Sequence, residues 1–147
     1  MSTYLSLHYH IVFSTKNRIP CLAIEWRERL FAYMSGTIGG LNGYPQRTGG
    51  WNDHVHILLG LKATHTVADV VRELKKASTA WVREEIGLRT FAWQEGYAAF
   101  TVGYRARDIV KAYIDRQEEH HGMKTYKEEV LSMLEEHGVE YDPKYFV

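Results

Sequence analysis

The sequence predicts an α+β fold in which one antiparallel sheet carries helices on one face and further helices follow at the C-terminal end. Short segments rich in β-branched and aromatic residues alternate along the chain with segments whose apolar residues recur at helical spacing. Glycine and proline turns separate them. With 147 residues and no repeat or linker, we expect one domain spanning residues 1–147.

The first half of the chain supplies four of the predicted elements. Residues 4–15, "YLSLHYHIVFST", alternate and read as a strand that ends at "NRIP". Residues 25–40 have helical spacing and end at two glycines. Residues 44–52, which include Pro45, predict a short strand or a loop, and residues 54–61 predict a strand.

The second half completes the pattern. Thr66 is a suitable N-cap for a helix over 67–86, whose apolar residues form one stripe. A strand follows over 97–104 and a helix over 106–121; Gly138 ends a last helix over 126–138. The order β-α-β-β-α-β-α-α begins with the split β-α-β unit of ferredoxin-like folds.

The charges are balanced overall but unevenly distributed. The formal net charge is +0, yet residues 1–112 carry 14 Lys and Arg against 9 Asp and Glu, whereas residues 113–142 carry 3 against 9. The mildly basic body permits a nucleic-acid surface without requiring one. The single cysteine excludes an intrachain disulfide, and no apolar run approaches the roughly 18 residues of a membrane helix. The N-terminus does not resemble a signal peptide, so we expect a cytoplasmic protein.

Two histidines stand one residue apart in "WNDHVHILLG", residues 51–60. On a strand His54 and His56 share a face, while Val55 and Ile57 face the opposite, core side. Two neutral imidazoles that converge can hold a divalent ion, although this needs a third ligand from elsewhere. The alternative is a pair of surface histidines on a half-buried strand.

A second motif, "KAYIDRQ" at residues 111–117, offers that ligand. Tyr113 and Gln117 are four residues apart on the predicted helix and therefore share a face. The pair by itself fits a structural tyrosine beside a solvated glutamine. The combination of a His-X-His strand with a helix that presents a hydroxyl and an amide oxygen is more specific.

Over about residues 4–121 the chain resembles the HUH single-tyrosine transposases of bacterial insertion sequences and their relatives associated with repetitive extragenic palindromes. The resemblance rests on four motifs in order: "YHIVFSTKNRIP", "DHVHILLG", "WQEGYAAFTVG" and "VKAYIDRQ". It implies that Tyr113 is the nucleophile. It further implies that His54, His56 and Gln117 bind Mg²⁺ or Mn²⁺.

The residue chemistry is consistent with this function. A tyrosine phenolate can attack a phosphodiester, expel a 3′-hydroxyl and remain as a 5′-phosphotyrosine from which the strand is rejoined. Free tyrosine has a pKa of about 10, so it needs help at neutral pH. A divalent ion would polarise the scissile phosphate and offset its growing charge.

The resemblance also implies partners: single-stranded DNA with hairpin or palindromic ends, and a second copy of the chain, which would place the protein at the nucleoid. In the implied homodimer, sheets join edge to edge and each Tyr113 helix can complete its neighbour's site. Residues 47–52, "RTGGWN", lack the lysines or prolines that would protect an edge strand. Gly103 offers a hinge before the Tyr113 helix.

Other residues are weaker candidates for DNA contact, metal binding or nucleophilic attack. Five basic side chains can contact phosphates or lie on ordinary solvated surface: Lys16, Arg18, Lys75, Lys76 and Arg105. His8 and His10 repeat the His-X-His spacing, and we expect them on the sheet face near the DNA rather than in a second metal site. Tyr126 is a rival nucleophile without a suitable partner four residues on. The helix over 126–138 is amphipathic and suits packing.

Three functions remain open at this point. The first is a metal-dependent, single-strand-specific DNA transposase. The second is a domesticated hairpin DNA- or RNA-binding protein that keeps the fold without strand transfer. The third is a small metal hydrolase that uses His54 and His56 and does not depend on Tyr113.

Overall fold

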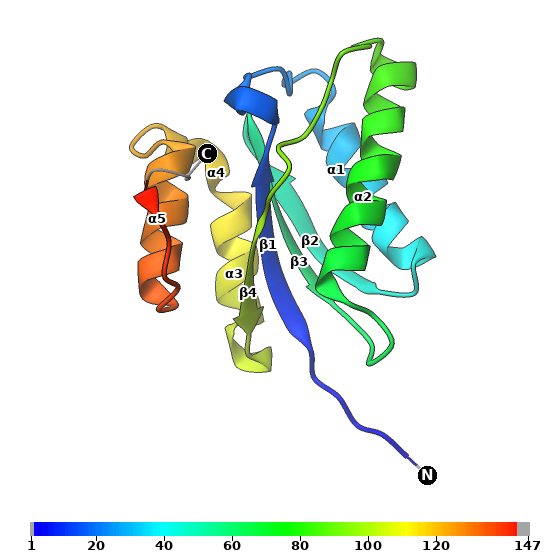
Figure 1. Ribbon diagram of the computed structural model, residues 1–147, viewed down its shortest axis with the longest axis vertical. Coiled ribbons are helices and arrows are strands. Elements are labelled where there is room, and N and C mark those ends of the chain that lie inside the picture. Colours follow the sequence, from blue (N-terminus) through cyan, green and yellow to red (C-terminus); the bar gives the residue numbers. More distant parts are fainter. Residues whose placement is uncertain (1, 144–147) are drawn as a thin grey trace.

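The computed structural model describes residues 2–143, and its centre is a four-stranded antiparallel sheet (Figure 1). The strands are β1 (His8–Ser14), β2 (Tyr44–Gly50), β3 (His54–Gly60) and β4 (Ala98–Val102). They lie in the order β2-β3-β1-β4, with β1 hydrogen-bonded between β3 and β4. This order confirms the predicted ferredoxin-like arrangement, and residues 44–50 form an edge strand rather than a loop.

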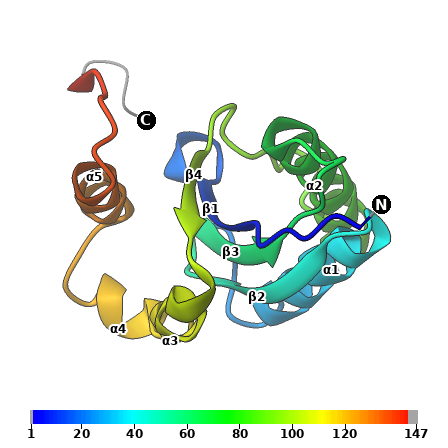
Figure 2. The same ribbon diagram turned by 90° about the horizontal axis from the view of Figure 1, so that it is seen from below.

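The helices lie on both sides of this sheet (Figure 2). On one face, α1 (Arg27–Gly40) and α2 (Val67–Trp81) pack side by side, as predicted. On the other face lie the C-terminal helices α3 (Arg107–Asp115), α4 (Gln117–His121) and α5 (Tyr126–Glu136). Among the described residues, shorter helical turns form η1 (Lys16–Arg18), η2 (Val82–Ile86) and η3 (Tyr104–Ala106).

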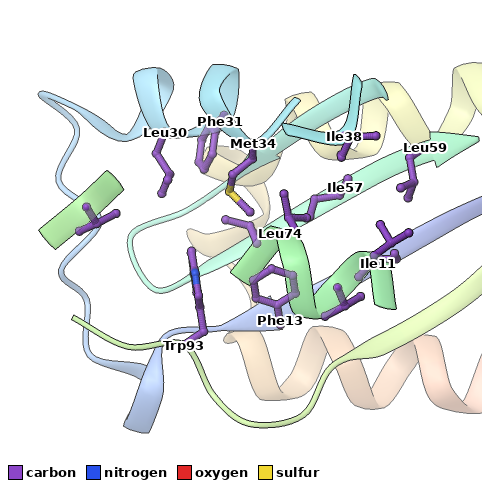
Figure 3. Close-up of a cluster of buried hydrophobic side chains, with 14 of the residues drawn as sticks. Ile11, Phe13, Leu30, Phe31, Met34, Ile38, Ile57, Leu59, Leu74 and Trp93 are labelled. Atoms are coloured by element: carbon purple, nitrogen blue, oxygen red, sulfur yellow. The ribbon is translucent and has the colours of Figure 1, made fainter. Parts of the chain in front are cut away.

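The main core lies between the sheet and the α1–α2 layer (Figure 3). Because successive side chains of a strand point to opposite faces, Ile11 and Phe13 of β1 and Ile57 of β3 reach this core. Their neighbours therefore face α3 and α5. On β3 these neighbours include His54 and His56, so the alternation of the strand positions the candidate site on the face of the C-terminal helices.

All four predicted helices are shorter than expected, and two of them differ in more than their ends. The helix over 67–86 ends at Trp81 and continues as the wider turn η2, while Thr66 caps its start by accepting from the Asp69 N–H as predicted. The helix over 106–121 is interrupted at Arg116, whose N–H bonds the carbonyl of Tyr113, only three residues back. Gln117 therefore begins α4, and it does not continue the helix that carries Tyr113.

The last helix is fixed at its start and along one side. The Thr125 hydroxyl accepts from the Glu128 N–H and the Glu128 carboxylate accepts from the Thr125 N–H, forming a capping box at the start of α5. Apolar residues of α5, including Val130 and Met133, pack against Val12 and Phe100 of the sheet. Within residues 2–143, none of the helices has the length and apolar character needed to cross a membrane.

Candidate metal centre and nucleophile

His54 and His56 are fully buried on β3, and each ring is held from behind by a second polar group. Nδ1 of His54 lies 2.7 Å from a carboxylate oxygen of Asp53. Nδ1 of His56 lies 2.8 Å from Nε2 of His10 on the neighbouring strand β1. With both Nδ1 atoms engaged, the Nε2 atoms are the ones directed toward α4 and α5. Outer hydrogen bonds of this kind orient metal-binding histidines.

Gln117 meets the histidines at this point. Its Oε1 atom lies 2.9 Å from Nε2 of His54, and the side chain is 2% exposed. The three predicted ligands thus lie together, although the helix between Tyr113 and Gln117 is interrupted. The nearby His121 of α4 has its Nε2 atom 3.0 Å from the same Gln117 oxygen.

Tyr113 lies beside the histidines at the end of α3. Its ring centroid is 5.6 Å from that of His56 and 6.1 Å from that of His10. It also lines a cavity of about 450 Å³ bordered by β4, α3 and α5. Burial, together with a hydrogen bond to Glu129 and the charge of its carboxylate, raises the pKa of the Tyr113 hydroxyl above its usual value.

Glu129 of α5 places its carboxylate beside the Nε2 atoms of His54 and His56. Its Oε1 atom lies 2.7 Å from Nε2 of His56 and 3.5 Å from Nε2 of His54, and the residue is 2% exposed. The Gln117 amide donates to its other oxygen at 3.3 Å, and His121 lies 3.5 Å from that oxygen. Glu129 connects all of the candidate groups.

Sequence reasoning assigned neither Glu129 nor His121 to this site. A signal for Glu129 was present, because the buried residues of α5 follow the spacing 126, 129, 130, 133, 134. Glu129 is therefore an acidic residue inside an apolar stripe, where a carboxylate is costly unless it has partners. The signal for His121 was its spacing, because it stands four residues after Gln117 and the two share a face on a helix.

The charges of the cluster follow from these contacts. Burial alone would lower the pKa of His54, but hydrogen bonds to Asp53 and Glu129 outweigh it and raise the pKa to about 9. Burial lowers the pKa of His56 to about 4 and that of His10 to about 3. Burial would raise the pKa of Glu129, but hydrogen bonds from His121, His54 and His56 hold it far below its usual range. These contacts favour an ionised Glu129 and a protonated His54, whereas burial favours the neutral forms of His56 and His10.

The donor set fits a divalent ion. Ligand atoms of His54, His121 and Glu129 lie within 4.8 Å of one another, and His56 and Gln117 adjoin the same group. Imidazole nitrogens with amide and carboxylate oxygens suit Mn²⁺ and similar ions.

The five basic residues do not share one environment. Lys16 and Arg18 in η1 and Arg105 in η3 are exposed, as is Lys76 on α2 across the sheet from the histidines. Lys75 is different: its ammonium donates to three backbone carbonyls, of Gln94, Glu95 and Gly96, at 2.7, 3.2 and 2.8 Å. These bonds favour a structural role for Lys75, which fastens α2 to the segment before β4.

The structure also locates the rival nucleophile Tyr126 and the second His-X-His pair, His8 and His10. Tyr126 lies near His54, with ring centroids 4.8 Å apart, but it is 5% exposed and its hydroxyl donates to the Gln94 side chain. His8 bonds Gln46 of β2 through its Nδ1 atom, at 2.8 Å. His10 instead supports His56, so the two histidines of β1 have different surroundings.

Comparison with known proteins gives matches at the level of family and fold. The model of the family "Transposase IS200 like" matches residues 3–117. A structure from Deinococcus radiodurans R1, described as a candidate transposase, aligns with a TM-score of 0.65 and 25% identity over 80% of this chain and 95% of that one. A REP-associated tyrosine transposase bound to a REP hairpin aligns with a TM-score of 0.61 and 18% identity, over 84% and 76% of the two chains. No curated protein matches the chain.

Proposed function

Because the chain belongs to the IS200-like transposase family, we propose that it cleaves and rejoins single-stranded DNA through a 5′-phosphotyrosine on Tyr113. The observation that carries this proposal is the convergence of Tyr113, His56, His54 and Gln117. The Tyr113 and His56 rings are 5.6 Å apart, and Gln117 bonds His54 at 2.9 Å. A nucleophile beside a buried donor cluster suits phosphoryl transfer.

In the proposed reaction the Tyr113 oxygen forms a bond to phosphorus, and the 3′-oxygen of the preceding nucleotide leaves with the bonding electron pair. The phenolic proton must be lost from Tyr113, and the leaving 3′-oxygen must gain one. Attack by the released 3′-hydroxyl on the phosphotyrosine reverses these changes and rejoins the strand. No nucleotide cofactor is needed, because the ester conserves the bond energy.

His54, His56 and Gln117 are the proposed metal-binding residues. A bound Mg²⁺ or Mn²⁺ would supply Lewis-acid polarisation of the scissile phosphate. Asp53 and His10 hold the two imidazole rings in the orientation this requires. Burial of both rings excludes water that would otherwise compete for their nitrogen atoms.

The proposed substrate is a single strand with hairpin or palindromic ends. The hairpin bound to the REP-associated tyrosine transposase supports this choice of substrate class, as does the family. The exposed Lys16, Arg18 and Arg105 are candidate phosphate contacts. A homodimer joined at the β2 edge is part of the proposal, since β2 is an outer strand of the sheet.

The test is to incubate the protein with a labelled single strand that carries a hairpin, in Mn²⁺, and to look for a covalent adduct on a denaturing gel. We expect an adduct with the wild type and with Tyr126→Phe, and none with Tyr113→Phe. Circular dichroism verifies that each variant is folded. An adduct that persists in Tyr113→Phe would overturn the nucleophile.

The same experiment separates the non-catalytic alternative. Hairpin binding by the wild type in a native gel, without any covalent product in Mn²⁺ or Mg²⁺, would identify a DNA-binding protein that does not transfer strands. Multiple turnover on a small phosphodiester, unchanged in Tyr113→Phe, would identify a metal hydrolase.

A further inference from the structure

Glu129 is a buried carboxylate that the tyrosine-based reaction does not by itself require. It lies on α5, beyond the residues 3–117 that match the family model. The residue is 2% exposed, and its two carboxylate oxygens face His56, His121 and the side-chain amide of Gln117. A buried carboxylate in such a place is stabilised best by a cation.

The spacing of the donor atoms fits a shared ion. In an octahedral site with metal–ligand distances of about 2.1 Å, neighbouring ligand atoms lie about 3 Å apart. Here His54 Nε2 is 2.9 Å from Gln117 Oε1 and 3.5 Å from Glu129 Oε1, and His56 Nε2 is 2.7 Å from the same Glu129 oxygen. The two shorter separations are also hydrogen-bond lengths, and all three are compatible with adjacent ligands around one ion.

The fold holds Glu129 in this position independently of any ion. The capping box at Thr125 fixes where α5 begins, one turn before Glu129. Val130 and Met133 on the same side of the helix pack on the sheet with Val12 and Phe100. The packing of α5 on the sheet therefore places the Glu129 carboxylate beside the histidines.

Resting on the function proposed above, we infer that Glu129 is a fourth protein ligand of the divalent ion, supplied by the C-terminal helix in addition to His54, His56 and Gln117. Four protein ligands leave two positions of an octahedral ion for phosphate oxygens or water. The carboxylate lowers the net charge of the bound centre from +2 to +1. In exchange it gives the site an oxygen ligand of the type that Mg²⁺ and Mn²⁺ prefer.

The experiment measures metal binding without DNA. Mn²⁺ is titrated into the full chain, and free Mn²⁺ is followed by its electron paramagnetic resonance signal. The variants are Glu129→Gln, which keeps the size of the side chain and one of its two accepting oxygens, and Glu135→Gln, an exposed position on the same helix, as the matched control. His54→Ala serves as the reference for loss of the site.

We expect the Kd for Mn²⁺ to rise at least tenfold in Glu129→Gln and to change less than twofold in Glu135→Gln. Tenfold is the lower end of the effect of removing an outer partner of a metal ligand, and loss of a direct ligand exceeds it. Circular dichroism establishes that Glu129→Gln is folded. Should it not fold, Glu129→Asp, which retracts the carboxylate by one methylene, is measured in its place with the same expectation.

Unchanged or tighter Mn²⁺ binding by the Glu129 variant would overturn the inference, and tighter binding would mean that Glu129 competes with the ion for the histidines. If His54→Ala loses binding in that case, the metal site of the proposed function stands and only the Glu129 ligand fails. If the wild type binds no Mn²⁺, or if His54→Ala binds it as the wild type does, the inference and the proposed metal site both fail. Formation of the Tyr113 adduct then tests separately whether the chain cleaves DNA through this tyrosine.

Discussion

His10 and His56 face each other across strands β1 and β3, with His10 Nε2 and His56 Nδ1 2.8 Å apart. A neutral His56 that donates from Nε2 to Glu129 accepts at Nδ1 from His10. If Nε2 instead binds an ion, Nδ1 carries the proton and donates to His10. The proton of this hydrogen bond can thus sit on His10 Nε2 or on His56 Nδ1 without movement of either ring. His10 is a positioning residue for His56 in both forms.

We therefore predict that His10→Ala raises the Kd for Mn²⁺ by about 10- to 100-fold, the usual effect of removing a group that orients a metal ligand. The measurement is the same Mn²⁺ titration. His8→Ala is the matched control, because His8 lies two residues away on β1 but bonds Gln46 instead. Equal losses in both variants would show that β1 is perturbed generally and that His10 has no specific role.

Gly49 of β2 and Ile114 of α3 are in close contact where the helix that carries Tyr113 packs on the sheet. A Cβ atom added at Gly49 would lie 2.7 Å from the Cγ2 atom of Ile114 and 3.2 Å from its carbonyl oxygen. Ile114 is itself 2% exposed and follows Tyr113 directly. The absence of a side chain at Gly49 thus allows α3 to approach the sheet closely.

Gly49→Ala should lower the free energy of unfolding by about 1–3 kcal/mol, the typical cost of overpacking a buried contact. It should also slow formation of the Tyr113 adduct, because α3 has to shift. Gly36→Ala is the control: this exposed position in α1 has no atom within 4 Å of the new Cβ. There alanine should stabilise by up to about 1 kcal/mol. Urea unfolding of both variants gives the comparison, and a Gly49→Ala protein as stable as the wild type would contradict the close-contact argument.

Lys75 and Lys76 are adjacent in sequence and differ in their contacts. Lys75 donates to three carbonyls of residues 94–96, whereas Lys76 is exposed. Replacing Lys75 by methionine leaves these carbonyls to water and unfastens the segment before β4. We expect Lys75→Met to reduce the free energy of unfolding by about 1–3 kcal/mol, and Lys76→Met to change it by less than about 0.5 kcal/mol.

The same pair tests the DNA-binding expectation. If Lys75 has a structural role alone, Lys75→Met leaves the slope of log Kd against log salt unchanged for hairpin DNA. A phosphate contact would reduce that slope by about one unit. A reduced slope in Lys75→Met with normal stability would restore Lys75 to the DNA surface.

The sequence predicts those parts of the fold and the site that depend on residues close together along the chain. Strand alternation was sufficient to place His54 and His56 on one face, and the order of elements was sufficient for the sheet. The interruption at Arg116 was not predictable from spacing, because Tyr113, Ile114 and Gln117 fit a continuous helix equally well. Glu129 could not be assigned from its neighbours alone, since its partners on β3 are more than 70 residues away in sequence.

The contacts of α3 bear on whether Tyr113 acts within its own chain. Tyr113, Gln117, His54, His56 and Glu129 all meet within one chain. The Gly103 connection has ordinary extended angles, φ −68° and ψ 150°, which any residue adopts, so glycine is not required there. Exchange of α3 with a neighbour would separate Ile114 from Gly49 and Gln117 from His54. These contacts favour action in cis, even in a homodimer joined at β2.

Mixing the chains provides the test. Tyr113→Phe lacks the nucleophile and His54→Ala lacks a proposed metal ligand, so neither forms the adduct alone. If each site is built within one chain, mixing them restores no adduct at any ratio, although light scattering finds dimers. In an exchanged dimer, a heterodimer would combine one intact histidine pair with one intact tyrosine. Recovery of about a quarter of the wild-type adduct, as one intact site in half of the dimers would give, would contradict action in cis and require α3 to leave its own sheet.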